Sequence, residues 1–226
     1  MARSGVDGLE VGGWAVDGMR APRSSFGHTL HVSSDETAER ILEATWALLR
    51  AGGGVTMAGV ADAVGISRQA VYLHVGSRAG LLVAVVRWVD RREGIAADMV
   101  AAADGRAPAA ALEALVRTWL DYLPRLHPAP IQLLAGGDHE ALAAWDDRMR
   151  ELERAYRGPL TELHAQGELR PELSVRRAVE LVRAVASLRA WDELVHGRRW
   201  SQRRAVDALW RAAAGAVLLA PPSGPT

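Results

Sequence analysis

The chain of 226 residues is long enough for one sizeable core or two small domains, and its 49% hydrophobic and 24% charged residues are typical of a globular protein. The formal net charge is zero, so any affinity for a polyanion has to come from local patches of charge. The chain has no cysteine, and all 27 of its basic residues are arginine, which excludes disulfides, thiolate catalysis, cysteine metal sites and lysine Schiff bases.

The N-terminal segment, residues 1–32, is rich in Gly, Ser and Pro and shows neither a helical nor a strand period. We therefore predict a flexible N-terminal arm. Its three arginines, Arg3, Arg20 and Arg23, allow two interpretations: a solvated tail, or an arm that reaches into a groove of DNA.

Every element predicted after the arm is a helix. Ser33 and Glu36 form a capping box, which predicts the start of the first helix. Short helices follow after Thr56 and Ser67, and a longer helix at 77–94 follows at Ser77; all three residues are favourable N-caps. Longer helices are predicted at about 108–126, 128–135, 138–166, 174–196 and 201–219.

The predicted fold class is all-α, because no segment combines β-branched residues with a period of two. An N-terminal three-helix domain at residues 33–80 precedes a larger helical domain at residues 81–220. Two short helices separated by Val-Gly-Ile-Ser give the first domain a helix-turn-helix pattern. In that turn Gly65 supplies the backbone freedom and Ser67 caps the next helix.

The second helix of this pattern has a chemically distinctive outer face. On a helical wheel Val71 faces the core, whereas Arg68, Gln69, Tyr72 and Leu73 face outward. Arginine and glutamine suit the edges of guanine and adenine in the major groove, and leucine suits a thymine methyl group. A tyrosine hydroxyl is a typical phosphate contact. The alternative is an ordinary surface helix with two exposed apolar side chains.

The segment TMAGVADAVGISRQAVYLHVGSRAGLLVAVV, residues 56–86, resembles the DNA-binding domain of the TetR/AcrR family of bacterial transcriptional regulators. With the first helix, the resemblance covers roughly residues 33–90. It implies that some residues hold phosphates, with Arg78 in place of the family's usual lysine, while others read bases. The predicted DNA-binding residues are Thr56, Ser67, Arg68, Gln69, Tyr72, Leu73, His74 and Arg78. For His74, a packed histidine at the core edge is the alternative.

A homodimer is expected because a recognition helix of about seven residues spans only about 10 Å. Specificity then requires two copies at half-sites about 34–36 Å apart. The helices at 174–196 and 201–219 carry apolar surface wider than one stripe, which fits a four-helix interface between two subunits, as the resemblance implies. The alternative is the core of a monomeric bundle.

The resemblance also implies a site for a small, largely apolar effector between the middle helices. By sequence alone the aromatic candidates are as easily core residues. The predicted ligand-binding residues are Trp119, Tyr122, His127, Gln132, Trp145, Met149, His164 and Arg189.

We expect a ligand-responsive transcriptional regulator, most often a repressor in this family, that binds a palindromic operator in double-stranded DNA as a dimer and is released by its effector. The alternative is a helical small-molecule-binding protein or an enzyme with a non-functional helix-turn-helix. We predict no catalytic residue, cofactor or metal: GxSxG, P-loop and HExxH motifs are missing, and Asp138, His139 and Glu140 are adjacent and point to different sides of a helix. No apolar run approaches the roughly 20 residues of a membrane helix, so we expect a soluble, cytoplasmic protein.

Overall fold

A computed structural model describes the backbone of residues 28–220 and the side chains of residues 35–220. Across these residues the chain is helical, and its single β-bridge joins Leu169 to Leu218. The all-α prediction is confirmed. The helices are α1 (His28–Arg50), α2 (Met57–Val64), α3 (Arg68–Val75), α4 (Arg78–Glu93), α5 (Ile95–Ala103), α6 (Pro108–Leu126), α7 (Pro128–Ala135), α8 (His139–Ala165), α9 (Val175–Val185), α10 (Leu188–Asp192), the π-helical turn η1 (Glu193–Gly197) and α11 (Gln202–Val217).

The first helix begins earlier than predicted. Helix α1 starts at His28, so Ser33 lies inside it and is not its N-cap, and residues 28–32 are helical. No glycine or proline occurs between His28 and Arg50, and extending an existing helix costs little once it has nucleated. The remainder of the predicted arm, with its three arginines, lies outside the described residues.

The described residues divide into two compact units. The first, called here the N-terminal unit, consists of residues 28–96 and 122–148; the second, the C-terminal unit, consists of residues 97–121 and 149–220. This division gives α7 and the adjoining parts of α6 and α8 to the same unit as α1–α4. The predicted domain boundary at residues 80 and 81 remains a prediction.

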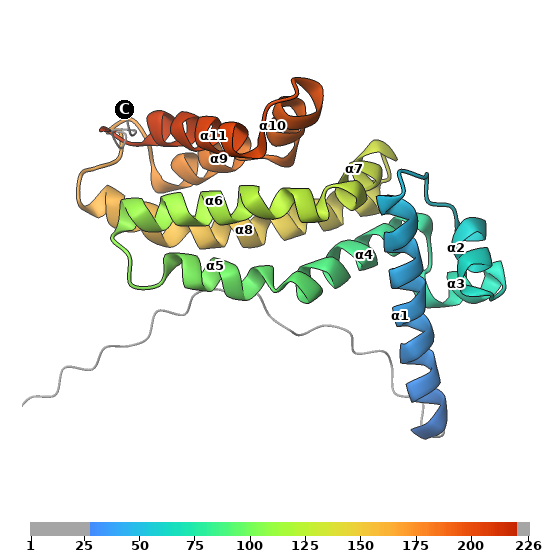
Figure 1. Cartoon of the computed structure of the whole chain (residues 1–226). Helices are drawn as coiled ribbons and strands as arrows, with labels where there is room; N and C mark the ends of the chain where they lie inside the picture. Colours follow the sequence, from blue (N-terminus) through green and yellow to red (C-terminus); the bar gives the residue numbers. More distant parts are fainter. Residues whose placement is uncertain (1–27, 221–226) are drawn as a thin grey trace, which may run out of the picture. The chain divides into compact units, whose positions relative to one another are not determined.

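In the N-terminal unit, α1 packs on α2, α4 and α7, and α3 packs on α2 and α4 (Figure 1). The side chains of Ile41, Val60, Val71, Leu81 and Val85 are fully buried and form the core of these contacts. Each sits on the apolar face of its helix, so the core follows directly from the sequence periodicity.

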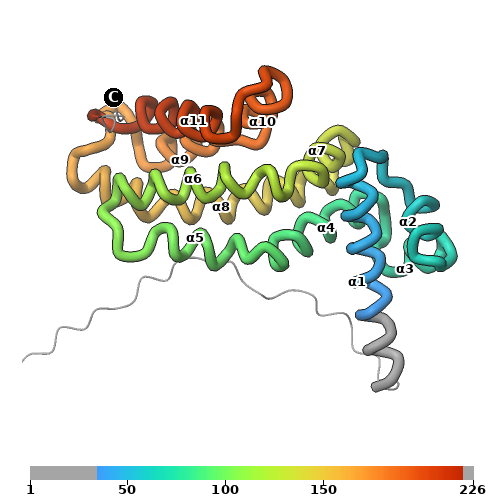
Figure 2. The backbone as a smooth tube through the Cα atoms, in the orientation of Figure 1, coloured from blue at the N-terminus to red at the C-terminus, as the bar shows by residue number. Residues whose placement is uncertain are grey.

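In the C-terminal unit, α9 and α11 lie side by side, with α10 beside the start of α11 (Figure 2). The helix predicted at 174–196 is in fact broken after Val185: Ala186 leaves the helical conformation and Ser187 caps α10. The break leaves the carbonyl of Ala186 free to accept a hydrogen bond of 2.8 Å from the indole Nε1 of Trp119. A tertiary contact therefore supports an interruption that local propensity did not predict.

Two further differences concern helix number and length. Helix α5 was not predicted, although Ile95, Met99 and Ala102 are buried at helical spacing. Gly94, with φ of 70°, separates it from α4. Within residues 28–220 no single helix is both long and apolar enough to cross a membrane; α3 and α4 meet those limits only together, across a bend of 63°.

Candidate nucleic-acid interface

The helix-turn-helix is built by local capping, as predicted. The Thr56 hydroxyl accepts a hydrogen bond of 3.0 Å from the amide of Gly59 at the start of α2. Gly65 ends α2 in the left-handed region, with φ of 75°. The Ser67 hydroxyl then accepts a hydrogen bond of 3.1 Å from the amide of Ala70 at the start of α3.

The two faces of α3 differ sharply in exposure. Val71 is 0% exposed and fixes the helix to the core, whereas Arg68 and Gln69 are exposed. Tyr72 is 38% exposed and Leu73 is 82% exposed. Full burial of a leucine side chain stabilises a fold by about 1.5–3 kcal/mol. Because Leu73 is largely exposed, it contributes little of this free energy to the folded monomer. We call Arg68, Gln69, Tyr72 and Leu73 the α3 outer face.

Two members of the α3 outer face contact each other. Arg68 Nη2 donates a hydrogen bond of 3.2 Å to the Tyr72 hydroxyl, and the guanidinium carbon lies 5.4 Å from the centroid of the tyrosine ring. The hydrogen bond to Tyr72 raises the pKa of Arg68, which keeps its positive charge. The guanidinium of Arg68 is thus oriented before any ligand is present.

The predicted phosphate contacts have unequal surroundings. Thr56 and Ser67 are exposed, but their hydroxyls already accept hydrogen bonds as helix caps. A hydroxyl can still donate its own hydrogen while it accepts. His74 is half-buried, which agrees with its position at the edge of the core. Arg78 is exposed, yet its Nε donates a hydrogen bond of 2.7 Å to the carbonyl of Val55.

Gln132 was predicted as a ligand-binding residue, but it lies on α7 against the loop between α1 and α2. Its Oε1 accepts hydrogen bonds from the amide of Val55, at 3.2 Å, and from Nη2 of Arg78, at 3.4 Å. Its Nε2 donates a hydrogen bond of 2.8 Å to the carbonyl of Gly53. Both ends of the amide are therefore used inside the protein.

The predicted aromatic ligand contacts are largely engaged in internal contacts. Trp119 is buried and donates to a backbone carbonyl, as described above. Tyr122 is fully buried and donates a hydrogen bond of 2.6 Å to Asp90 Oδ1. Burial raises the pKa of Tyr122, and the neighbouring Asp90 carboxylate raises it further. Trp145 is half-buried beneath the guanidinium of Arg148, which lies 5.4 Å from its ring.

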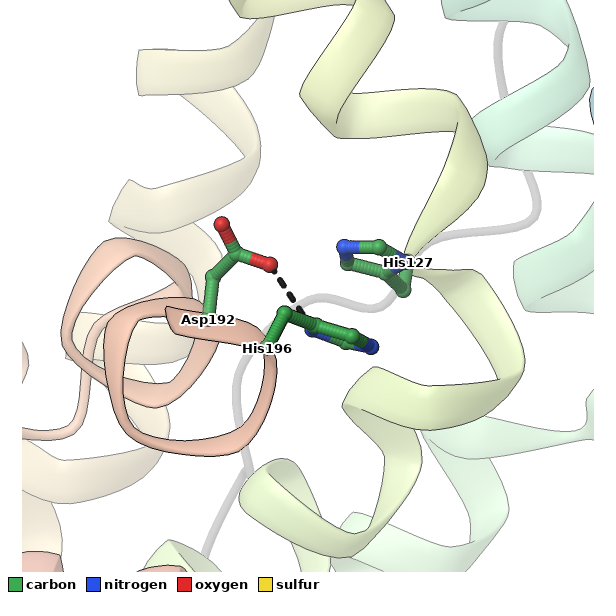
Figure 3. A group of neighbouring side chains, drawn as sticks. All are labelled: His127, Asp192 and His196. Carbon is green, nitrogen blue, oxygen red and sulfur yellow. Dashed lines mark hydrogen bonds and ion pairs between the residues drawn. The ribbon is translucent and has the colours of Figure 1, made fainter. Parts of the chain in front are cut away.

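The remaining predicted ligand residues have different exposures. Met149 is buried and His127 is half-buried, whereas His164 and Arg189 are exposed. Close to Arg189 in sequence, Nδ1 of His196 and a carboxylate oxygen of Asp192 lie 2.9 Å apart (Figure 3). The two residues are one helical turn apart, so this is a local pair.

Two features escaped sequence reasoning. Asp90 on α4 and Arg148 on α8 form a buried, bidentate ion pair. Arg148 Nε donates to Asp90 Oδ2 at 2.8 Å, and Arg148 Nη2 donates to Asp90 Oδ1 at 2.7 Å. Tyr156 on α8 is 0% exposed, and its hydroxyl has no hydrogen-bond partner among the described residues. No sequence signal marks the ion pair, because its members are 58 positions apart; Tyr156 interrupts an otherwise apolar stripe of α8, which is a usable signal.

The helices predicted to form a dimer interface keep apolar side chains at the surface. On α9, Leu181 is 37% exposed, Ala184 is exposed and Val185 is half-buried. On α11, Ala212 is exposed and Ala216 is half-buried. The opposite faces of both helices are buried in the C-terminal unit, so these residues form a second apolar stripe on each helix.

Comparison with known proteins agrees with this geometry. Residues 41–85 match the sequence model of the bacterial regulatory proteins of the tetR family. No curated protein sequence matches the chain. Among solved structures, a protein described as a TetR-family transcriptional regulator from Rhodococcus sp. has a TM-score of 0.64 and 17% identity, with 80% of this chain and 98% of that chain covered.

Two other similar structures belong to regulators. The transcriptional regulator FadR from Bacillus subtilis, in complex with stearoyl-CoA, has a TM-score of 0.62 and 14% identity, with 79% of this chain and 98% of that chain covered. NalD, the secondary repressor of the MexAB-OprM multidrug efflux pump in Pseudomonas aeruginosa, has a TM-score of 0.58 and 21% identity, with 83% of this chain and 98% of that chain covered. Residues 41–85 are therefore a helix-turn-helix domain of the tetR family, and the chain has the fold of TetR-family transcriptional regulators.

Proposed function

We propose that this protein is a ligand-responsive transcriptional regulator that binds a palindromic operator as a homodimer. The α3 outer face carries the proposal. It presents a guanidinium, an amide, a phenol and an 82% exposed leucine on a helix whose opposite side buries Val71 in the core. Arg68 and Gln69 would read base edges, and Leu73 would contact a thymine methyl group. Tyr72 would contact a DNA phosphate, and further contacts to the DNA backbone would come from Thr56, Ser67, His74 and Arg78.

In vitro selection from a pool of random double-stranded DNA tests the proposal without knowledge of the operator. We expect enrichment of a duplex with two inverted half-sites about one helical turn apart. In fluorescence anisotropy, Arg68→Ala should weaken binding of that duplex by about 1–3 kcal/mol and reduce the preference over a scrambled duplex. Arg157→Ala, at an exposed arginine of α8, is the control. If no sequence is enriched by the wild type, the proposed function is wrong.

The homodimer is proposed to form through α9 and α11, and the surface apolar stripes described above support it. Leu181→Arg places a charge in that stripe, so sedimentation velocity should show a shift from dimer to monomer. Leu142→Arg is a matched control, because Leu142 is 40% exposed on α8 and Leu181 is 37% exposed. A wild-type monomer, or equal behaviour of the two variants, argues against this interface.

We further propose that a small, largely apolar effector releases the operator. The stearoyl-CoA complex of FadR is one support from similar structures. The buried hydroxyl of Tyr156 also supports an effector site. A buried polar atom without a hydrogen-bond partner costs about 1–3 kcal/mol, and a ligand group that bonds to this hydroxyl would remove that cost. We propose Met149 and Tyr156, both on the part of α8 that belongs to the C-terminal unit, as contacts of the effector. A screen of apolar compounds for release of the selected duplex tests this proposal, and a duplex that no compound displaces contradicts it.

A further inference from the structure

The loop between α1 and α2 is held by side chains from outside it. Arg78 at the start of α4 donates to the carbonyl of Val55, and Gln132 on α7 accepts from the amide of the same residue. Gln132 also donates to the carbonyl of Gly53. Both backbone polar groups of Val55 are thus bonded to side chains from two other helices, and its own side chain is 1% exposed.

The loop has little conformational preference of its own. Residues 52–54 are three consecutive glycines, and Gly52 has φ of 78°, in the left-handed region. A glycine run loses much conformational freedom when it is ordered, so contacts from outside have to supply the order. Helix α7 is placed to do so, because it packs against both α1 and α4 (Figure 1).

The loop determines where the helix-turn-helix begins. Val55 directly precedes Thr56, the N-cap of α2, and only Gly65, Ile66 and Ser67 separate α2 from α3. A displacement of Val55 therefore displaces α2, and α3 with it. Gln132 is the one polar side chain of α7, and it bonds to this loop.

We propose that Gln132 is a positioning residue that sets the orientation of the helix-turn-helix through its two hydrogen bonds to the α1–α2 loop. Its influence on DNA binding rests on the proposed function. Helix α7 then acts on the recognition helix through the α1–α2 loop and α2, in addition to the chain connection through α4. A change that withdraws α7 by the length of one hydrogen bond frees the glycine loop and lowers operator affinity.

The first measurement is amide hydrogen exchange on the full-length protein, which needs no DNA. Gln132→Met keeps the length of the side chain but removes its donor and its oxygen acceptor. We expect exchange in residues 52–56 to become about tenfold faster, because the Val55 amide loses its partner. Gln166→Met, at an exposed glutamine beyond α8, should change nothing in that segment.

The second measurement is affinity for the duplex selected with the wild type, at a temperature well below unfolding. Gln132→Met should bind about three- to tenfold more weakly, and Gln132→Glu should lie between it and the wild type, because the carboxylate still accepts from Val55 and Arg78. Gln132→Glu also decides the question if the methionine variant does not fold. Unchanged exchange at residues 52–56, or faster exchange with unchanged duplex affinity, overturns the inference. If the proposed function itself is wrong, the wild-type protein selects no duplex, and this outcome is distinct from failure of the inference about Gln132.

Discussion

The buried ion pair between Asp90 and Arg148 gives the sharpest prediction about stability. The side chain of Arg148 is 9% exposed and that of Asp90 is 14% exposed, and Tyr122 donates a further hydrogen bond to Asp90. Asp90→Ala leaves a buried guanidinium without this partner, which costs about 3–5 kcal/mol. A chain of this size loses about 2–4 °C in Tm per kcal/mol, so we expect a fall of about 6–20 °C.

Thermal and urea unfolding followed by circular dichroism measure this loss. Glu93→Ala is the control, because the pair of Glu93 with Arg125 is 34% and 43% exposed and such pairs contribute about 0–1 kcal/mol. The double variant Asp90→Ala with Arg148→Met should recover part of the loss, since the buried charge that loses Asp90 is removed with it. The reasoning is refuted if Asp90→Ala costs no more than Glu93→Ala, or if the double variant is the least stable of all.

Three other predictions concern single side chains. Tyr156→Phe removes a buried hydroxyl without a partner and should leave stability unchanged or raise it by about 1–3 kcal/mol in urea unfolding; a loss would reveal a hidden partner. Burial raises the pKa of Tyr156 above its usual value, so the unfolded chain ionises this phenol first and stability falls as pH rises above about 10. The phenylalanine variant should therefore lose less stability between about pH 9 and pH 11, one unit either side of that value. Ser67→Ala removes the cap of α3 and should cost about 0.5–2 kcal/mol, with Ser67→Gly, which costs only a few tenths, as the comparison in the same assay. Gly65→Ala forces a side chain into the left-handed region and should cost about 1–2 kcal/mol, whereas equal midpoints would show that the turn relaxes.

The helix-turn-helix was predictable because its determinants are local. Thr56, Ser67 and Ser77 each cap a helix through the amide three residues later, and these spacings are visible in the sequence. The outward side of α3 followed from helical periodicity, which placed Val71 on the core side. What those outward residues bind stays a prediction.

Features that depend on distant partners were not predictable. Gln132 meets Gly53 across 79 positions, and its amide looks in the sequence like any polar residue on an amphipathic helix. The hydrogen bond at the Ala186 break comes from Trp119, 67 positions away. The error at Ser33 had the opposite cause: a favourable cap was present, but the backbone was already helical before it, and a cap acts only where a helix begins.

Helix α4 is bonded to other elements near both of its ends, and this placement bears on how release of DNA would work. At the first residue of the helix, Arg78 bonds to Val55; three residues before the end, Asp90 bonds to Arg148. Helix α4 has 16 residues and is about 24 Å long. Because side-chain bonds hold it near both ends, it can tilt only if the bonds at one end break. An effector that shifts the balance between operator-binding and released states from 1:99 to 99:1 needs about 5.5 kcal/mol of differential affinity. Loss of the Asp90 pair alone corresponds to about 3–5 kcal/mol, whereas the hydrogen bond from Arg78 to Val55, which has a charged donor, contributes about 1.5–3 kcal/mol. The Val55 end is therefore the weaker attachment, and α4 should yield there first.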